Sequence, residues 1–182
     1  MKFVEQDLKD VYLVHLEKME DERGFFSRVY CQKEFGDLAL ELNWVQMNMS
    51  FTKNKGTVRG IHWQNAPYTD AKLVRCIKGA VFDVVVDLRK DSRSYGEWLS
   101  VELSDKNHSA VYIPRGFGHG FQTLEHNCEL LYFHSHEFVK SSEGGLALDD
   151  PSVGISWPLP VVDVSDRDLQ QPSLSNINPI EI

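Results

Sequence analysis

Hydrophobic and polar residues alternate along most of the chain, and this alternation predicts strands. The clearest case runs from Gly79 to Leu88, where Phe82, Val84, Val86 and Leu88 alternate with Val81, Asp83, Val85 and Asp87. A spacing of two is typical of one face of a β-strand. Similar patterns predict one or two strands within residues 1–19 and further strands at Phe25–Cys31, Trp44–Thr52, Val58–Gln64, Ala71–Ile77, Trp98–Leu103, Ala110–Ile113 and Glu129–His136.

Helical patterns are few. Apolar residues three and four apart predict a helix within Lys33–Leu42, although Gly36 weakens it, and Ser165–Leu169 has the composition of a helix start. So few helices are not enough to cover a parallel sheet. The chain is therefore predicted to be an all-β sandwich or barrel with one or two short helices, forming a single domain over residues 1–182. The polar tail from Pro172 to Ile182 is expected to be loosely held.

Composition and charge exclude several classes of protein. Hydrophobic residues make up 42% of the 182 residues, as in an ordinary globular protein, and the net charge of -8 disfavours a general nucleic-acid binder. No apolar run approaches the roughly 18 residues of a membrane span. The charged N-terminal sequence lacks the apolar core of a signal peptide, so we expect a cytoplasmic protein. Three widely spaced cysteines predict buried free thiols rather than a disulfide framework or zinc site.

The segment from Gly56 to Arg75 concentrates chemically active side chains. On its first strand, period two places His62 and Gln64 on the face of Gly60, and it places Arg59 with Ile61 and Trp63 on the other. Lys72 lies on the next strand, where it can face the same cavity as His62. A histidine and a lysine on adjacent strands suggest proton transfer.

Three other segments combine polar groups with strand-like or glycine-rich sequence. Asp83 lies among valines and is expected either in water near a strand end or paired inside with Lys72 or His62. Gln46 and Asn48 lie on one face of the predicted strand Trp44–Thr52; this face could line a polar cavity, although we favour a half-exposed strand with a water-facing side. The three glycines around His119 predict a loop in which the backbone turns sharply and a neighbouring segment approaches closely.

Several phrases of the chain, taken together and in order, resemble one enzyme family. They are Arg23-Gly24-Phe25-Phe26, Val58-Arg59-Gly60-Ile61-His62-Trp63-Gln64, Lys72-Leu73-Val74-Arg75, Gly79-Ala80-Val81-Phe82-Asp83-Val84, Ile113-Pro114 with Gly116-Phe117-Gly118-His119-Gly120-Phe121, Leu131-Tyr132, and Asp150-Pro151 with Ile155-Ser156-Trp157-Pro158. From about residue 5 to 174, this sequence resembles the dTDP-4-dehydrorhamnose 3,5-epimerase family. The resemblance implies a cupin-type jelly roll and a homodimer with strand exchange near the N-terminus. It also implies inversion of the carbons that flank the C4 ketone of a dTDP-linked 4-keto-6-deoxy sugar, with no metal or redox cofactor.

This chemistry requires a base on one face of the sugar, an acid on the other, and a donor to the enolate oxygen. By the resemblance, His62 is the base, and Asp168 orients it and stabilises its protonated form. Tyr132 returns a proton from the opposite face, and Lys72 stabilises the enolate. The plainer alternatives are a core histidine, a helix cap formed by Ser165 with Asp168, a packing tyrosine, and a lysine that neutralises Asp83.

The resemblance also implies a set of substrate-binding residues. Arg23 and Arg59 would hold the diphosphate, with Arg167 as a weaker candidate. Phe26, Gln46 and Asn48 would contact nucleotide or sugar, and His119 and Asp83 would support the site. His119 can alternatively be a structural residue.

The chain departs from the family's usual phrases close to the expected sugar. Tyr132-Phe133-His134 replaces tyrosine-lysine-cysteine, Asp70-Ala71 replaces glutamine-glycine, Val58 replaces leucine, and a tyrosine is absent near Glu137-Phe138. These departures leave open a 3- or 5-epimerase that acts on one carbon.

Three other functions stay open. A metal-dependent cupin would need several converging ligands, of which His134 and His136 could supply two. A sugar-nucleotide 3,4-ketoisomerase uses similar proton transfers, and its product would distinguish it. A non-catalytic sugar-nucleotide binding protein is disfavoured by the joint presence of His62, Lys72, Tyr132 and Asp168.

Overall fold

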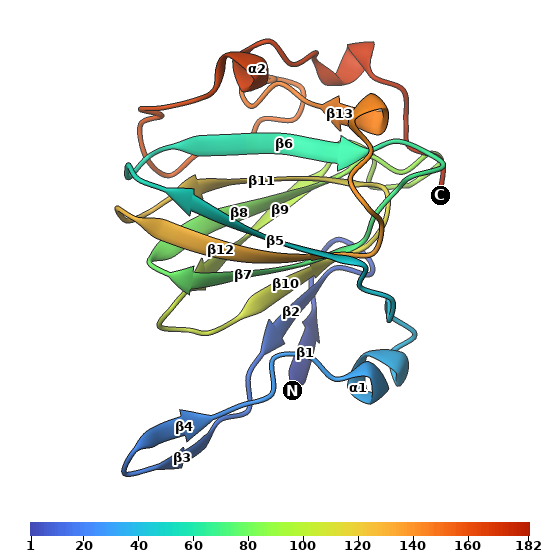
Figure 1. Cartoon of the computed structure of the whole chain (residues 1–182). Coiled ribbons are helices and arrows are strands. Elements are labelled where there is room, and N and C mark those ends of the chain that lie inside the picture. The colour runs from blue at the N-terminus through green and yellow to red at the C-terminus, as the bar shows by residue number, and fades with distance from the viewer.

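Two antiparallel sheets face each other in the computed structural model, which describes residues 1–182 (Figure 1). The first sheet has the order β1 (Lys2–Glu5), β2 (Tyr12–His15), β10 (Ala110–Ile113), β7 (Lys72–Lys78), β12 (Cys128–His134) and β5 (Gln46–Thr52). The second has the order β13 (Glu143–Gly145), β6 (Val58–Gln64), β11 (Phe117–Thr123), β8 (Ala80–Asp87) and β9 (Trp98–Ser104). Most neighbours in each sheet are distant in sequence, which is the jelly-roll topology. The all-β prediction is confirmed.

The predicted alternation on β8 separates two hydrophobic clusters. Val81 and Val85 point between the sheets, where they pack with Val74 of β7 and Leu130 of β12. Val84 and its alternating neighbours face the other way, toward residues from the C-terminal part of the chain. Both faces of the five-stranded sheet are therefore covered, one by the facing sheet and one by the C-terminal segment (Figure 1).

The C-terminal tail is docked, contrary to the prediction of a loosely held segment. Ile180 is only 2% exposed and packs in the second cluster. Its N–H donates to the carbonyl of Leu88 over 2.7 Å, and Leu174 and Ile177 pack against the same cluster. Leu174, Ile177 and Ile180, three residues apart, hold this otherwise polar segment in place.

The helices are few and short. They are α1 (Gln32–Gly36), α2 (Asp166–Leu169) and the 3-10 turns η1 (Lys140–Ser142) and η2 (Leu174–Asn176). The helix predicted to reach Leu42 ends earlier, and Ala39 has a φ of 55°, outside helical geometry. None of these helices is long and apolar enough to cross a membrane. Among the cysteines, Cys76 and Cys128 are buried thiols as predicted, whereas Cys31 is half-buried.

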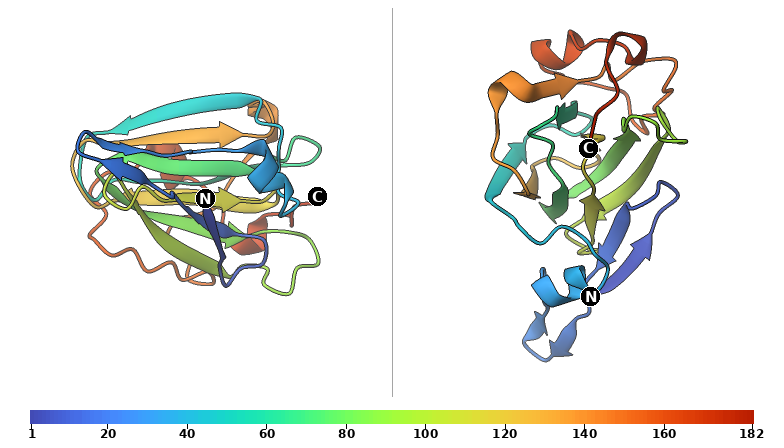
Figure 2. Two further views of the ribbon diagram at one scale, coloured as in Figure 1. Left: turned by 90° about the horizontal axis from the view of Figure 1, so that it is seen from below. Right: turned by 90° about the vertical axis from the view of Figure 1, so that its right-hand side faces the viewer.

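A short hairpin projects from the body of the molecule, formed by β3 (Met19–Asp21) and β4 (Gly24–Phe26) (Figures 1 and 2). All of its strand residues are exposed. The strand predicted over Phe25–Cys31 therefore ends at Phe26, because the following residues turn back toward α1 and pair with no strand.

Strands β6 and β11 approach each other closely at Gly60 of β6 and at Gly118 and Gly120 of β11. Gly60 has a φ of 111°, and a Cβ atom there would lie 2.6 Å from the Cα of Gly120. At Gly118, a Cβ atom would lie 2.6 Å from Cγ2 of Ile61. The glycine-rich phrase is thus a strand rather than the predicted turn, whereas the predicted close approach of a neighbour is confirmed by its contact with β6.

This close approach also changes which side chains share a face. The pairing of β6 and β11 shifts register between His119 and Phe121, opposite Gly60. Strict alternation is interrupted there, so Arg59 lines the same cavity as His62. The prediction that Arg59 would share a face with Ile61 is wrong for this reason.

A Gly60→Ala substitution is expected to destabilise the protein by about 3 kcal/mol or more, since it combines an unfavourable φ with a backbone clash. Gly24 is the matched control, because it has a φ of 129° and a Cβ atom added there would meet no other atom within 4 Å. Gly24→Ala should cost only the conformational part, about 1–2 kcal/mol. Urea denaturation measures both, and equal losses would contradict the clash.

Candidate active site

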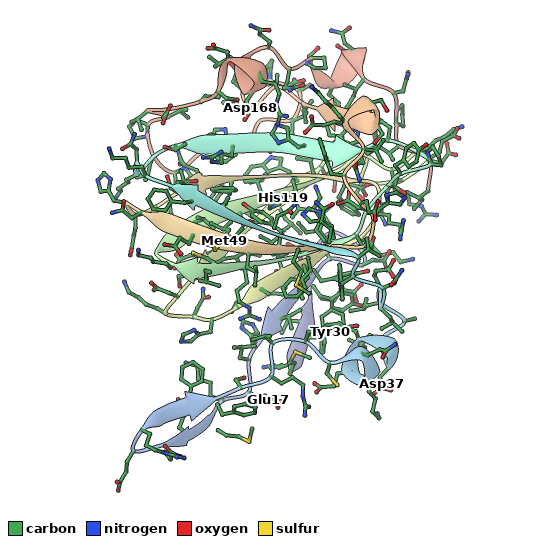
Figure 3. All side chains as sticks on the ribbon, in the orientation of Figure 1. Glu17, Tyr30, Asp37, Met49, His119 and Asp168 are labelled. Atoms are coloured by element: carbon green, nitrogen blue, oxygen red, sulfur yellow. The ribbon has the colours of Figure 1, made fainter.

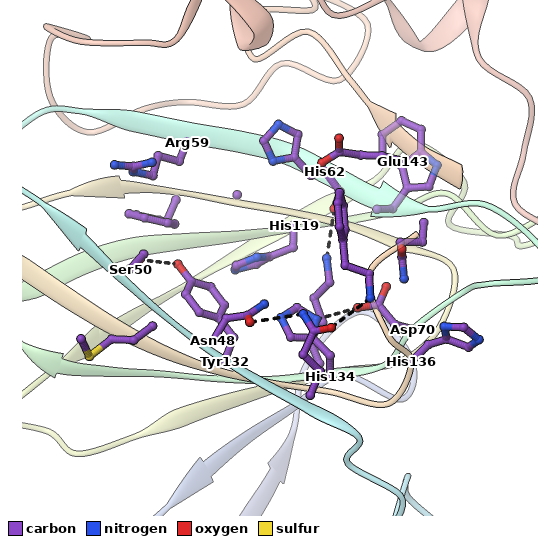
Figure 4. A pocket seen from close by; sticks show the side chains of 18 of the residues that line it. Asn48, Ser50, Arg59, His62, Asp70, His119, Tyr132, His134, His136 and Glu143 are labelled. Atoms are coloured by element: carbon purple, nitrogen blue, oxygen red, sulfur yellow. Dashed lines mark hydrogen bonds and ion pairs between the residues drawn. The ribbon is translucent and has the colours of Figure 1, made fainter. Parts of the chain in front are cut away.

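A cavity of about 310 Å³ lies between the two sheets (Figure 4). Strands β5, β7 and β12 supply one wall, and β6, β11 and Glu143 of β13 supply the other. The lining is mostly polar and contains Gln46, Asn48, Ser50, Arg59, His62, Asp70, Lys72, His119, Tyr132, His134, Glu143 and Arg167. A jelly roll with a polar lining of this kind encloses a ligand site rather than a packed core.

His62 is held by Asp168, which arrives from the C-terminal segment. The two side chains meet at 2.7 Å between Nε2 and Oδ1, and the other carboxylate oxygen accepts the N–H of Gly60. Asp168 also donates its own N–H to the Ser165 side chain at the start of α2. Figure 3 shows Asp168 and His119 on opposite sides of β6. Asp168 therefore takes part both in the N-terminal cap of α2 and in the contact with His62.

Asp168 stays ionised. Burial favours its protonated form, but the hydrogen bond and charge of His62, together with the Gly60 N–H, lower the pKa of the Asp168 carboxyl to about 2. An ionised carboxylate stabilises a proton on the Nε2 atom of His62. In that tautomer Nδ1 is the unprotonated nitrogen.

Arg167 lies beside this nitrogen. Its Nη2 is 3.3 Å from Nδ1 of His62 and 2.9 Å from Nε2, and its Nη1 pairs with Glu143 at 2.9 Å. A guanidinium can donate only to an unprotonated ring nitrogen, so Nδ1 is its acceptor when Asp168 holds the proton on Nε2. Arg167 is 53% exposed at the edge of the cavity.

Tyr132 lies on the facing sheet, on β12. Its hydroxyl is 2.9 Å from that of Ser50 (Figure 4). Burial raises the pKa of the Tyr132 phenol well above its ordinary value, and the Ser50 contact offsets only part of this. Tyr132 therefore carries its proton at neutral pH, on the wall opposite the one that carries His62.

Lys72 and Asp83 do not pair with each other. Lys72 is buried, and its ammonium donates to the carbonyl oxygen of His62 at 3.3 Å. Asp83 is fully buried and contacts Nε2 of His119 at 2.9 and 3.0 Å. The predicted partners of Asp83, Lys72 or His62, are wrong, because β11 places His119 next to β8. Burial raises the pKa of Asp83, while the charges of His119 and Lys72 oppose this.

The amide face of β5 points into the cavity. Gln46 and Asn48 line it and are joined by a hydrogen bond of 3.2 Å, and Arg59 reaches the same space while donating to Thr52. The opposite face of β5 is also exposed, with Met49 65% accessible (Figure 3). The amide face lines the cavity and is partly open to water, because Asn48 is exposed and Gln46 half-buried, so the water-facing interpretation and its cavity-lining alternative both hold.

Arg23 and Phe26 are not brought into this cavity by their own chain. Both lie on the projecting hairpin, where Arg23 pairs with Asp21 and Phe26 is 70% exposed. The other ten predicted site residues lie in or directly behind the cavity lining.

Two cavity residues, His134 and Asp70, have no role in the epimerase site predicted from the sequence. Nδ1 of His134 is 2.8 Å from Asp70 Oδ2, inside the cavity. The alternation on β12 places His134 on the face of Tyr132, but it suggests His134 only as a metal ligand beside His136. His136 instead contacts the Glu137 carbonyl, and no group of three or more His, Cys, Asp or Glu side chains is placed to hold a metal ion.

Comparison with known proteins places this arrangement in context. Residues 5–176 match the sequence profile described as dTDP-4-dehydrorhamnose 3,5-epimerase. An enzyme of that name from Sinorhizobium fredii is 40% identical over 97% of this chain and 91% of its own length. The crystal structure of dTDP-4-dehydrorhamnose 3,5-epimerase from Elizabethkingia anophelis superposes with a TM-score of 0.94 at 38% identity, covering 98% of each chain. A dTDP-4-dehydrorhamnose 3-epimerase from Streptomyces niveus is 38% identical, over 88% of this chain and 78% of its own length.

Removing the charge of Asp168 should make stability less dependent on pH. The folded pKa of about 2 lies below the ordinary 3.8, so ionised Asp168 stabilises the fold fully above about pH 4, and this contribution disappears as pH falls through about 2. The free energy of unfolding of Asp168→Asn should therefore fall below that of the wild type near neutral pH and approach it in acid. Urea denaturation across this pH range tests the prediction, with exposed Asp166→Asn as the control. A difference that is independent of pH would contradict it.

Proposed function

The chain belongs to the dTDP-4-dehydrorhamnose 3,5-epimerase family, and we propose that His62 and Tyr132 carry out its proton transfers. The predicted family and isomerase class are confirmed by the comparisons. The substrate we infer is a dTDP-linked 4-keto-6-deoxy sugar, used in deoxysugar biosynthesis of the rhamnose type. Its cytoplasmic location stays a prediction.

The proposed reaction follows from the positions of the two proton-carrying groups. His62 removes a proton from a carbon next to the C4 ketone, and Asp168 stabilises the imidazolium that forms. Lys72, close to the His62 backbone, supplies positive charge for the enolate oxygen. Tyr132 returns a proton from the other side of the sugar ring, so that the carbon is inverted.

One observation supports this assignment above all. On one wall of the cavity, His62 is paired with the buried, ionised carboxylate of Asp168. On the facing wall lies Tyr132, whose phenol stays protonated. Groups whose environments favour opposite protonation states suit an acid and a base. We propose inversion at both C3 and C5, as in the family's name. Inversion of a single carbon is the alternative, since the relative from Streptomyces niveus is named a 3-epimerase.

His62→Ala is expected to lower turnover by at least two to four orders of magnitude, because the base is removed. Binding of dTDP should persist, since the groups proposed to hold the nucleotide are unchanged. Steady-state kinetics and calorimetric titration with dTDP measure the two effects. His126→Ala, at an exposed histidine outside the cavity, is the control. Near-normal turnover in His62→Ala would show that another group is the base.

Tyr132→Phe keeps the ring but removes the proton that we assign to the second step. Inversion should slow strongly, whereas His62 should still exchange the substrate's carbon-bound hydrogen with solvent. Proton NMR in deuterated water separates exchange from inversion. Unchanged inversion by this variant would remove Tyr132 from the mechanism.

A second copy of the chain would explain three features that a single copy leaves incomplete. The hairpin carries Arg23 and exposed Phe26 away from the body (Figure 2). The outer face of the six-stranded sheet exposes apolar side chains such as Met49 and Ile77. On the same face, Arg75 is 7% exposed, burial lowers its pKa to about 10, and its Nη2 has no hydrogen-bond partner. We propose a homodimer in which these faces meet and each hairpin supplies Arg23 and Phe26 to its partner's cavity.

Mixing two inactive variants tests this exchange. If Arg23 acts in the partner's cavity, a heterodimer of His62→Ala and Arg23→Ala chains contains one site with both residues intact. Refolding the two variants together should therefore restore up to half of wild-type activity per heterodimer. Mixing either variant with an Arg23→Ala/His62→Ala double variant is the control. No recovery in heterodimers verified by mass spectrometry would mean that Arg23 does not act across the dimer.

A further inference from the structure

The cavity contains a further imidazole–carboxylate pair besides those of His62 and His119; it is formed by His134 and Asp70, on the same wall as Tyr132 (Figure 4). His134 follows Tyr132 by two residues on β12, so both point inward. Their rings are nearly parallel, with an interplanar angle of 20° and centroids 6.1 Å apart. Asp70 is almost completely buried, with 4% of its side chain exposed, while His134 retains 16%.

One nitrogen of His134 is left available to a ligand. Asp70 engages Nδ1 at 2.8 Å, whereas Nε2 has no partner in the protein. Nε2 of His134 is not buried without a partner, because the only buried side-chain polar atoms that lack a hydrogen bond are Nε1 of Trp44 and Nη2 of Arg75. Since the ring lines the cavity, Nε2 is open to whatever the cavity binds.

The surroundings of Asp70 determine which hydrogen bond Nε2 can make. Burial favours a neutral Asp70, but the charge of nearby Lys72 and the hydrogen bond with His134 lower its pKa below the ordinary value. Ionised Asp70 accepts a hydrogen bond from the Nδ1–H group of His134 and thereby fixes that tautomer. In the neutral imidazole Nε2 is then an acceptor, which pairs with a hydroxyl group.

Asp70 and His134 come from different segments, the loop before β7 and the strand β12, and they meet in a direct contact. This contact fixes the position of the His134 ring in the cavity wall.

We propose that His134 is a specificity-determining residue that accepts a hydrogen bond from a ring hydroxyl of the hexose, and that Asp70 is its positioning residue. This inference rests on the proposed substrate. A 4-keto-6-deoxy hexose linked through C1 has only two ring hydroxyls, at C2 and C3. His134 therefore recognises one of these, beside the carbon that Tyr132 protonates.

The test compares His134→Phe with the wild type on three substrates: dTDP-4-keto-6-deoxyglucose and its 2-deoxy and 3-deoxy analogues. Deuterium incorporation beside the C4 ketone, at C5 or at C3, is the common readout for all three. His134→Phe should lower kcat/KM for the parent sugar roughly tenfold to hundredfold, the effect of a lost hydrogen bond in a buried site. For the analogue that lacks the recognised hydroxyl, the same substitution should change kcat/KM less than about threefold.

Two further variants separate recognition from packing. His134→Gln retains an acceptor and should recover part of the activity on the parent sugar. Asp70→Asn should lower activity in the wild-type background but add little in the His134→Phe background, because Asp70 acts through the imidazole. His126→Phe, outside the cavity, controls for a general effect of a histidine-to-phenylalanine change, and thermal denaturation verifies that each variant folds.

The outcomes distinguish this inference from the function on which it rests. Equal losses on all three substrates, or no loss on the parent, would overturn the role of His134 while leaving the epimerase assignment intact. If the wild type incorporates deuterium into none of the three substrates, the proposed substrate itself is wrong.

Discussion

The hydrogen bond between His62 and Asp168 joins positions 106 residues apart and connects fold to chemistry. It ties the C-terminal segment to β6, and the same carboxylate accepts the N–H of Gly60, where β6 is irregular. Because Asp168 is buried and ionised, it holds a proton on one nitrogen of His62 and leaves the other basic. The C-terminal segment that covers the outer face of the sheet therefore also prepares the catalytic base.

Buried carboxylates form the supporting framework of the cavity. Asp168, Asp83 and Asp70 each contact a histidine, namely His62, His119 and His134. An isolated buried carboxylate is costly, and an imidazole partner offsets that cost while its own ring becomes fixed in orientation. Asp168 fixes His62, Asp70 fixes His134, and fully buried Asp83 fixes His119, and all three rings line the cavity.

Sequence patterns predicted those parts of the fold that depend on local periodicity. Alternation located β8 and placed Tyr132 and His134 on one face of β12, and the order of short phrases led to the family. Features that depend on contacts between strands could not be predicted from these sequence patterns. The glycines of β11 are required by Ile61 and Gly60 of another strand, so they resembled a loop. Asp83 pairs with His119 only because β8 and β11 are neighbours. Arg23 and Phe26 lie on the projecting hairpin outside the cavity of their own chain, and periodicity gave no sign of this position.

The central claim is that His62 and Tyr132 exchange protons with the carbons beside a ketone. Its most direct test is proton NMR of dTDP-4-keto-6-deoxyglucose with the wild-type protein in deuterated water. We predict deuterium at both C3 and C5, with inverted configuration. Deuterium at one carbon would restrict the enzyme to a single centre. A carbonyl moved to C3, or no incorporation at all, would contradict the claim.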